Sequence, residues 1–199
     1  MAFASSPELE WVAMFSSIVY VYLAAKGNIW CWLSGFLSCL LFTFVFLYQQ
    51  VHTQIILNIL YMLMAIWGWI MWMEPKREGH PSEFEVWPLK QHLSTNAGLL
   101  ALAYLLYIVV PQWFGHQSIL LEIILVLGSV FATITTIYKV VESWIYWLVL
   151  DLLGVYLYWQ GGSINLAYFV IHALLAVYGL VLWRQYRHDD IENVSALHS

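Results

Sequence analysis

The stretch QIILNILYMLMAIWGWIMWM occupies residues 54–73 and contains no charged side chain. A helix of this length rises about 30 Å at ~1.5 Å per residue, which matches the hydrocarbon core of a bilayer. A second stretch, INLAYFVIHALLAVYGLVLW at residues 164–183, has the same length and the same lack of charge. Both stretches therefore predict transmembrane helices.

Five more apolar spans surround these two in the sequence. They cover residues 10–25, 29–48, 96–114, 119–138 and 144–160. Hydrophobic residues make up 62% of the 199 residues and charged residues only 10%, which is typical of a polytopic membrane protein. Only the connection 74–95 is long, and its glutamates and prolines predict a solvated cytoplasmic loop. We therefore expect an all-α membrane protein with seven transmembrane helices in one domain, residues 1–199.

The basic residues predict the orientation of the chain. All Lys and Arg residues fall in alternate connections or in the tail: Lys26, Lys76, Arg77, Lys90, Lys139, Arg184 and Arg187. Cytoplasmic loops retain Lys and Arg, so we expect the N-terminus outside and the C-terminus in the cytoplasm. The net charge of −5 comes largely from the long loop and the acidic tail, and it predicts no nucleic-acid partner.

Internal similarity predicts a duplicated unit. A shift of 111 residues superposes several pairs, among them Gln54 on Asn165, Tyr61 on His172, Gly68 on Gly179 and Trp72 on Trp183. Three helices end on the opposite side from their start, so two copies in the same orientation need one extra span between them. We expect a 3+1+3, SWEET-like arrangement with a central cavity between the repeats. Its parts are repeat one at 10–73, a linker helix at 96–114, repeat two at 119–183 and a cytoplasmic tail at 184–199.

The span 144–160 carries an acid near its middle. Trp144, Trp147, Asp151 and Gly154 fall on one helical stripe. A carboxylate at mid-depth costs about 2.5 kcal/mol or more on insertion scales, so Asp151 is expected to face a partner or a wet cavity. The alternative is a protonated Asp151 that only fixes helix packing.

Other polar and aromatic side chains lie on matching stripes of the two repeats. Amide, hydroxyl and imidazole groups can hydrogen-bond a ligand, but they also hold transmembrane helices together at about 0.6–2 kcal/mol per contact. Indole rings attract a flat cation at about 0.5–2 kcal/mol per contact when desolvated. The predicted ligand is therefore a flat, cationic, hydroxylated small molecule. The predicted substrate-binding residues are Trp32, Gln54, Asn58, Tyr61, Trp144, Trp147, Asp151, Asn165 and His172.

The sequence predicts neither an enzyme nor a metal or cofactor site. A membrane enzyme would need clustered acids or a His-rich metal set, whereas the seven His residues are scattered and no two share ligand spacing within a helix. A seven-helix ligand sensor without transport is an alternative of a different class. The direct repeat favours a carrier over a sensor.

Three segments together carry a family resemblance: AKGNIWCW at 25–32, YMLMAIWGWIMW at 61–72 and ESWIYWLVLD at 142–151. Their order and spacing resemble the PnuC family of nicotinamide riboside transporters, over about residues 8–187. The resemblance implies a seven-helix fold of two three-helix repeats. It also implies facilitated uptake of nicotinamide riboside, an NAD precursor, across the bacterial inner membrane. Nicotinamide riboside is a pyridinium cation carrying a ribose, which agrees with the predicted ligand.

The resemblance leaves a second interpretation open. Thiamine carriers of the PnuT type share the fold, and thiamine is also a flat aromatic cation with a hydroxyl group. Leu33 follows Trp32 where the family often has a proline, so the start of the span 29–48 departs from the family pattern. The expected partners are the vitamin precursor and the lipid bilayer. A cytoplasmic kinase that traps the substrate by phosphorylation is expected as a functional link, and a homo-oligomer is left open.

Overall fold

The computed structural model describes residues 7–74, 82–109, 119–158 and 164–197. They form seven helices: α1 (Pro7–Ala25), α2 (Trp30–Gln49), α3 (His52–Met73), α4 (Leu89–Val109), α5 (Ile119–Ile137), α6 (Ser143–Tyr158) and α7 (Ile164–Leu197). Five are long and apolar enough to cross a membrane, while α5 and α6 contain shorter apolar stretches. In the described ranges no strand occurs, only one isolated bridge between Glu85 and Val140. The predicted all-α fold with seven helices is confirmed.

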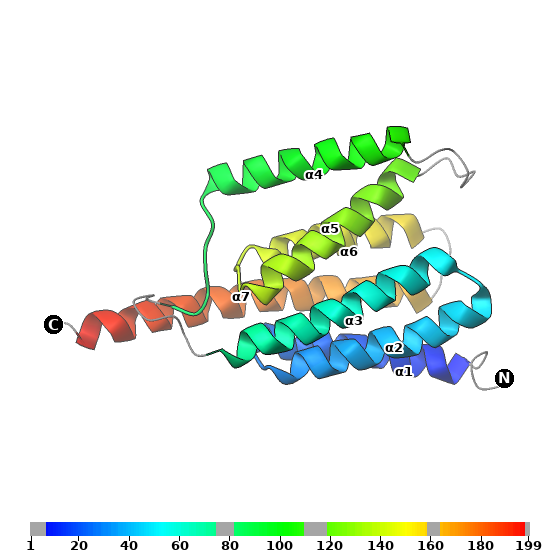
Figure 1. Ribbon diagram of the computed structural model, residues 1–199. Coiled ribbons are helices and arrows are strands. Elements are labelled where there is room, and N and C mark those ends of the chain that lie inside the picture. Colours follow the sequence, from blue (N-terminus) through cyan, green and yellow to red (C-terminus); the bar gives the residue numbers. More distant parts are fainter. Residues whose placement is uncertain (1–6, 75–81, 110–118, 159–163, 198–199) are drawn as a thin grey trace.

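Six of the helices form a closed ring. α1 packs on α2, α2 on α3, α3 on α5, α5 on α6, α6 on α7, and α7 on α1. The remaining helix, α4, packs on α5, and Figure 1 shows it lying on the outer side of α5, away from α1 and α2. The first three helices therefore meet the last three along two seams, α3 against α5 and α7 against α1.

Two helices differ in extent from the prediction. The linker helix is predicted at 96–114, but α4 begins at Leu89 and ends at Val109, and residues 110–118 lie outside the described part. The carbonyl of Pro88 accepts hydrogen bonds from Gln91 and His92 at 2.9 and 3.4 Å, so the polar residues before the apolar span already form a helical turn. α7 continues through the predicted tail to Leu197, because residues 184–197 contain no Gly or Pro to end it.

The prediction of a solvated loop is wrong for residues 82–88, which we call the strap. The side chain of Phe84 is only 9% exposed, and its ring centroid lies 5.0 Å from that of Trp183. The backbone of Glu85 bonds to the α5–α6 connection, donating to the carbonyl of Lys139 at 3.0 Å and accepting from Val141 at 2.9 Å. The glutamates make the loop polar on average, so its composition predicts solvent exposure and does not indicate that Phe84 is buried. Residues 75–81 lie outside the described part.

Each half of the ring buries a tryptophan against a glycine. A Cβ on Gly68 would lie 2.5 Å from the ring of Trp32, and a Cβ on Gly179 would lie 2.5 Å from the ring of Trp144. Only glycine allows these helices to approach the rings so closely. Each indole also meets a second tryptophan edge-on, with ring centroids 5.3 Å apart in both halves. All of this packing lies where α1, α3 and α5 end and α2 and α6 begin. The predicted orientation would turn this end of the ring toward the cytoplasm, and we call it the inner end.

The second tryptophan of each pair, Trp72 or Trp183, reaches across a seam. The indole Nε1 of Trp72 on α3 donates to the carbonyl of Ile137 on α5 at 3.0 Å. The indole Nε1 of Trp183 on α7 donates to the carbonyl of Ala24 on α1 at 3.1 Å. Two equivalent tryptophans thus bond to the last turns of two equivalent helices. This reciprocity supports the predicted division into two like-oriented repeats, which remains a prediction.

Candidate functional site

An acid lies buried about midway along α6. Asp151 is 6% exposed, so its side chain is directed toward neighbouring helices rather than toward the outer surface of the bundle. Within the described ranges its carboxylate has no hydrogen-bond or ion-pair partner. A buried acid at this depth is costly, so the two alternatives for Asp151, ligand binding or helix packing, both remain predictions.

A polar cluster lies on the α1–α7 seam, and α7 also packs on α6, the helix that carries this acid. The hydroxyl of Ser17 is 2.8 Å from the hydroxyl of Tyr168 and 3.4 Å from Nε2 of His172. The rings of Tyr168 and His172 lie one helical turn apart with centroids 4.2 Å from each other. The structure thus places the predicted site residue His172 in a buried polar cluster. It adds two residues that are absent from the prediction, Ser17 and Tyr168.

The other seam carries the equivalent contact. Tyr61 on α3 donates a hydrogen bond to the hydroxyl of Ser129 on α5, and Ser129 in turn donates to the carbonyl of Val126 at 2.9 Å. Tyr61 corresponds to His172 at a shift of 111, and Ser17 corresponds to Ser129 at a shift of 112. Both seams are therefore joined by a polar contact near the middle of the ring.

The remaining predicted residues of α3 and α7 are three amides, Gln54, Asn58 and Asn165. Asn58 is buried, and its amide donates to the carbonyl of Gln54 on the same helix at 2.8 Å. Gln54 itself has an exposed side chain. The side chain of Asn165 lies outside the described part of the structure. Of the two predicted amides whose side chains the structure describes, Asn58 is thus the buried one.

The predicted tryptophans divide into two groups. Trp147 is partly buried, lies one turn before Asp151, and donates its indole N–H to the hydroxyl of Thr136 at 3.1 Å. Trp32 and Trp144 are fully packed at the inner end. Trp144 lies about 10 Å from Asp151 along the axis of α6, at ~1.5 Å per residue. Their packing roles are clear, whereas ligand contact by these two rings remains a prediction.

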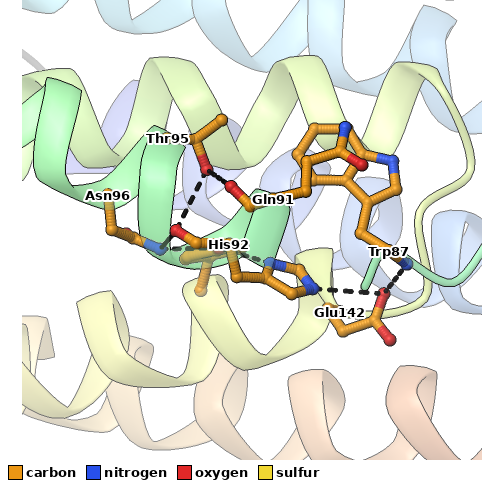
Figure 2. A network of polar contacts seen from close by, with 7 residues as sticks. Trp87, Gln91, His92, Thr95, Asn96 and Glu142 are labelled. Carbon is orange, nitrogen blue, oxygen red and sulfur yellow. Dashed lines mark hydrogen bonds and ion pairs between the residues drawn. The ribbon is translucent and has the colours of Figure 1, made fainter. Parts of the chain in front are cut away.

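A second polar network anchors α4 to the second half of the ring (Figure 2). Nδ1 of His92 lies 2.8 Å from the hydroxyl of Tyr146, which also accepts from the amide of Asn96 at 2.9 Å. The carboxylate of Glu142 accepts from the backbone N–H of Trp87 at 3.3 Å and lies 3.9 Å from Nε2 of His92. These contacts involve none of the predicted site residues. The network therefore holds the linking helix in place and is separate from the candidate site.

Comparison with known proteins now bears on this site. The family model described as nicotinamide mononucleotide transporter matches residues 8–185. The chain belongs to this family. It is thus a membrane protein of a transporter family, as the resemblance of its Trp-rich segments predicts.

Individual relatives of this transporter are distant but cover most of the chain. A nicotinamide riboside transporter PnuC of Neisseria mucosa is 25% identical over 92% of this chain and 75% of the relative. The protein of the same name from Escherichia coli K12 is 22% identical, over 90% and 87% of the two chains.

A solved structure shares the fold of this transporter. The crystal structure of the vitamin B3 transporter PnuC is similar with a TM-score of 0.75 and 23% sequence identity. The match covers 96% of this chain and 85% of the other. At this identity the likeness bears on the fold alone, and the site has to be argued from the residues of this chain.

Proposed function

We propose that this transporter carries nicotinamide riboside into the bacterial cell across the inner membrane, with the N-terminus outside and the C-terminus in the cytoplasm. The observation that carries the proposal is the buried, mid-depth carboxylate of Asp151 inside a ring of helices. Relatives over most of the chain are named nicotinamide riboside transporters. A pyridinium cation is the charge that such an acid would complement.

The distribution of charge favours a nucleoside over a nucleotide. A phosphorylated substrate would bring negative charge to the middle of the membrane, where Arg or Lys would be needed to pair with it. None of the seven Lys and Arg residues of the sequence falls in the central part of a span. The one ionisable acid at mid-depth would repel a phosphate. The unphosphorylated riboside therefore fits this chain better than the mononucleotide.

The substrate would be held by groups from both repeats. Its ring would face Asp151, with Trp147 one turn away to stack on it. Its ribose hydroxyls would meet the polar contacts of the two seams, around Tyr61 on one side and Tyr168 and His172 on the other. Breaking and remaking these seam contacts as residues 10–73 rock against 119–183 would expose the site to each side in turn.

The proposed transport is facilitated diffusion and involves no chemical reaction. Such a carrier only equilibrates its substrate, so net uptake in the cell would depend on a cytoplasmic kinase that removes the free riboside. A sensor would also bind the riboside, but it would show no flux. Thiamine is also a flat cation that Asp151 could complement. We rank it second because the relatives are named for nicotinamide riboside.

Uptake into proteoliposomes tests the proposal. Labelled nicotinamide riboside should equilibrate without accumulating, with or without a pH gradient. Excess unlabelled riboside should compete, and excess thiamine or nicotinamide mononucleotide should compete at least about tenfold less well. Asp151→Asn should weaken riboside binding by at least about 30-fold, because it removes one partner of a desolvated charge pair.

Three results would contradict the proposal. Equal competition by thiamine would favour the thiamine interpretation, and tight binding without flux would favour a sensor. Gradient-driven accumulation above the external concentration would exclude simple facilitation. Cys39→Ser is a matched control for Asp151→Asn, because Cys39 also lies on a ring helix about midway through the membrane and carries no charge.

A further inference from the structure

The centre of the ring is filled with aromatic side chains at the inner end. Trp72 from the first half and Trp183 from the second meet there, with ring centroids 6.2 Å apart. Both indoles are buried, and each bonds to a carbonyl of the opposite half. The two halves are thus locked together at this end by a pair of tryptophans, one from each half.

Phe84 of the strap completes this layer. Its ring packs against Trp183 and lies 5.8 Å from the ring of Tyr186. It also approaches Gly27 in the α1–α2 connection, where a Cβ would lie 3.5 Å from Cζ of Phe84. Phe84 therefore wedges between α7 of the second half and the end of α1 in the first half.

The rest of the strap is fixed to the second half. Ser82 and the backbone N–H of Glu83 donate to the carboxylate of Asp190 on α7 at 2.7 and 3.1 Å. The Glu83 carboxylate pairs with the ammonium group of Lys139 at 2.6 Å. The same ammonium group lies 5.0 Å from the centroid of Trp72, so it adds a cation–π contact to the first half. The strap would consequently move with the second half when the halves separate.

We propose that Trp72, Trp183 and Phe84 form the inner gate of the carrier, with the strap as the latch that holds Phe84 in place. This inference rests on the proposed transport function and adds the residues that close its cytoplasmic exit. In this structure the inner gate is closed. Opening requires both indole–carbonyl bonds to break and Phe84 to leave the first half, so the gate opens as one unit rather than residue by residue.

A buried thiol can report on the opening of the gate. Cys31 is fully buried in the same cluster as Phe84, Trp72 and Trp183. The sequence has two cysteines, so Cys39→Ser leaves Cys31 as the single thiol. In that background, a charged maleimide that does not cross membranes is added to inverted vesicles, which expose the cytoplasmic face, or to spheroplasts, which expose the outer face. The rate of Cys31 labelling is measured by mass spectrometry.

Phe84→Ala should raise the rate of Cys31 labelling at least about tenfold in inverted vesicles and leave it unchanged in spheroplasts. The reason is that removal of the Phe84 ring increases the fraction of molecules whose inner gate is open. Val86→Ala is the matched control, since Val86 lies on the same strap and is 45% exposed. Trp72→Phe and Trp183→Phe keep an aromatic ring but remove one bond across the seam. Each should raise the rate by about threefold, and these milder variants keep the test valid if Phe84→Ala does not fold.

An unchanged labelling rate in Phe84→Ala or in both tryptophan variants would overturn the gate, as would a rise from the outer face alone or equally from both faces. Labelling requires no substrate. Failure of the unmodified protein to transport nicotinamide riboside would therefore overturn the proposed function and leave the gate result standing. Normal transport combined with unchanged labelling would overturn the gate alone.

Discussion

The two halves of the ring are alike at its inner end and differ at its middle. At the inner end both halves repeat the same parts, a tryptophan on a glycine and a second tryptophan bonded across a seam. At mid-depth the equivalent positions differ: Tyr61 corresponds to His172, and at a shift of 112 Asp151 corresponds to Cys39. Packing between two similar halves can be symmetric. A ligand without twofold symmetry needs unlike groups around it, so the departure from symmetry marks where the ligand would lie.

The largest effect should come from breaking the symmetric packing. Gly68→Ala and Gly179→Ala would each place a methyl group 2.5 Å from an indole ring that is itself enclosed. We expect each to destabilise the protein by about 3 kcal/mol or more, and by similar amounts, because overpacking has no room to relax here. Thermal unfolding in detergent, followed by fluorescence-detected size exclusion, measures this.

The control for the glycine variants lies on α4. Gly98→Ala meets nothing within 4 Å and should leave the melting temperature the same or slightly higher, since alanine favours a helix over glycine. Clearly unequal losses for Gly68→Ala and Gly179→Ala would argue against equivalent halves.

The next effect should come from moving the acid to the other half. Asp151→Asn should weaken riboside binding by at least about 30-fold, and the double variant Cys39→Asp/Asp151→Cys should not restore it. The reason is that the hydroxyl, imidazole and indole groups would stay where they are, so a substrate turned to face the new acid would lose its other partners. Calorimetry on the purified protein measures this. Restored affinity in the double variant would mean that the middle of the ring is as symmetric as the inner end.

A smaller effect should come from the seam contact of the first half. Tyr61→Phe removes the hydroxyl that bonds to Ser129, and it should raise the KM for riboside uptake by about fivefold, as expected for one lost hydrogen bond. Ser129→Ala removes the partner and keeps the tyrosine hydroxyl available for a ligand. If Tyr61 contacts the substrate directly, Ser129→Ala should therefore have the weaker effect on KM. Equal effects would assign Tyr61 a packing role only.

Sequence reasoning predicted the parts of this molecule that depend on composition. Seven spans follow from long runs of apolar residues without charge, and the correspondence of Gly68 with Gly179 and of Trp72 with Trp183 follows from the shift of 111. The strap was missed because Phe84 stands among glutamates. The seam serines were missed because a serine in an apolar helix can equally bond to its own backbone, as Ser16 does to the carbonyl of Val12 at 2.9 Å.

The ends of helices and the contacts across the seams were also not predicted from the sequence. Hydropathy shows where lipid surrounds the chain, so it predicts the start of α4 at the apolar boundary, residue 96, rather than at Leu89. Two residues can be predicted to lie on one helical face from their spacing, but a contact such as Ser17 with Tyr168 joins residues 151 positions apart. Such a contact depends on the packing of the whole ring.

The smallest effect on transport should come from the network around α4, for which the described residues of the first half show no counterpart. Tyr146→Phe removes the hydroxyl that joins His92 and Asn96 to α6. We expect a loss of stability of about 1 kcal/mol, because buried polar partners lose a hydrogen bond. The rate of riboside uptake per folded molecule should stay unchanged, since the network lies apart from Asp151 and from both seams. Proteoliposomes with matched amounts of folded protein measure this rate, and a clear fall would mean that α4 takes part in the rocking of the halves rather than only linking them.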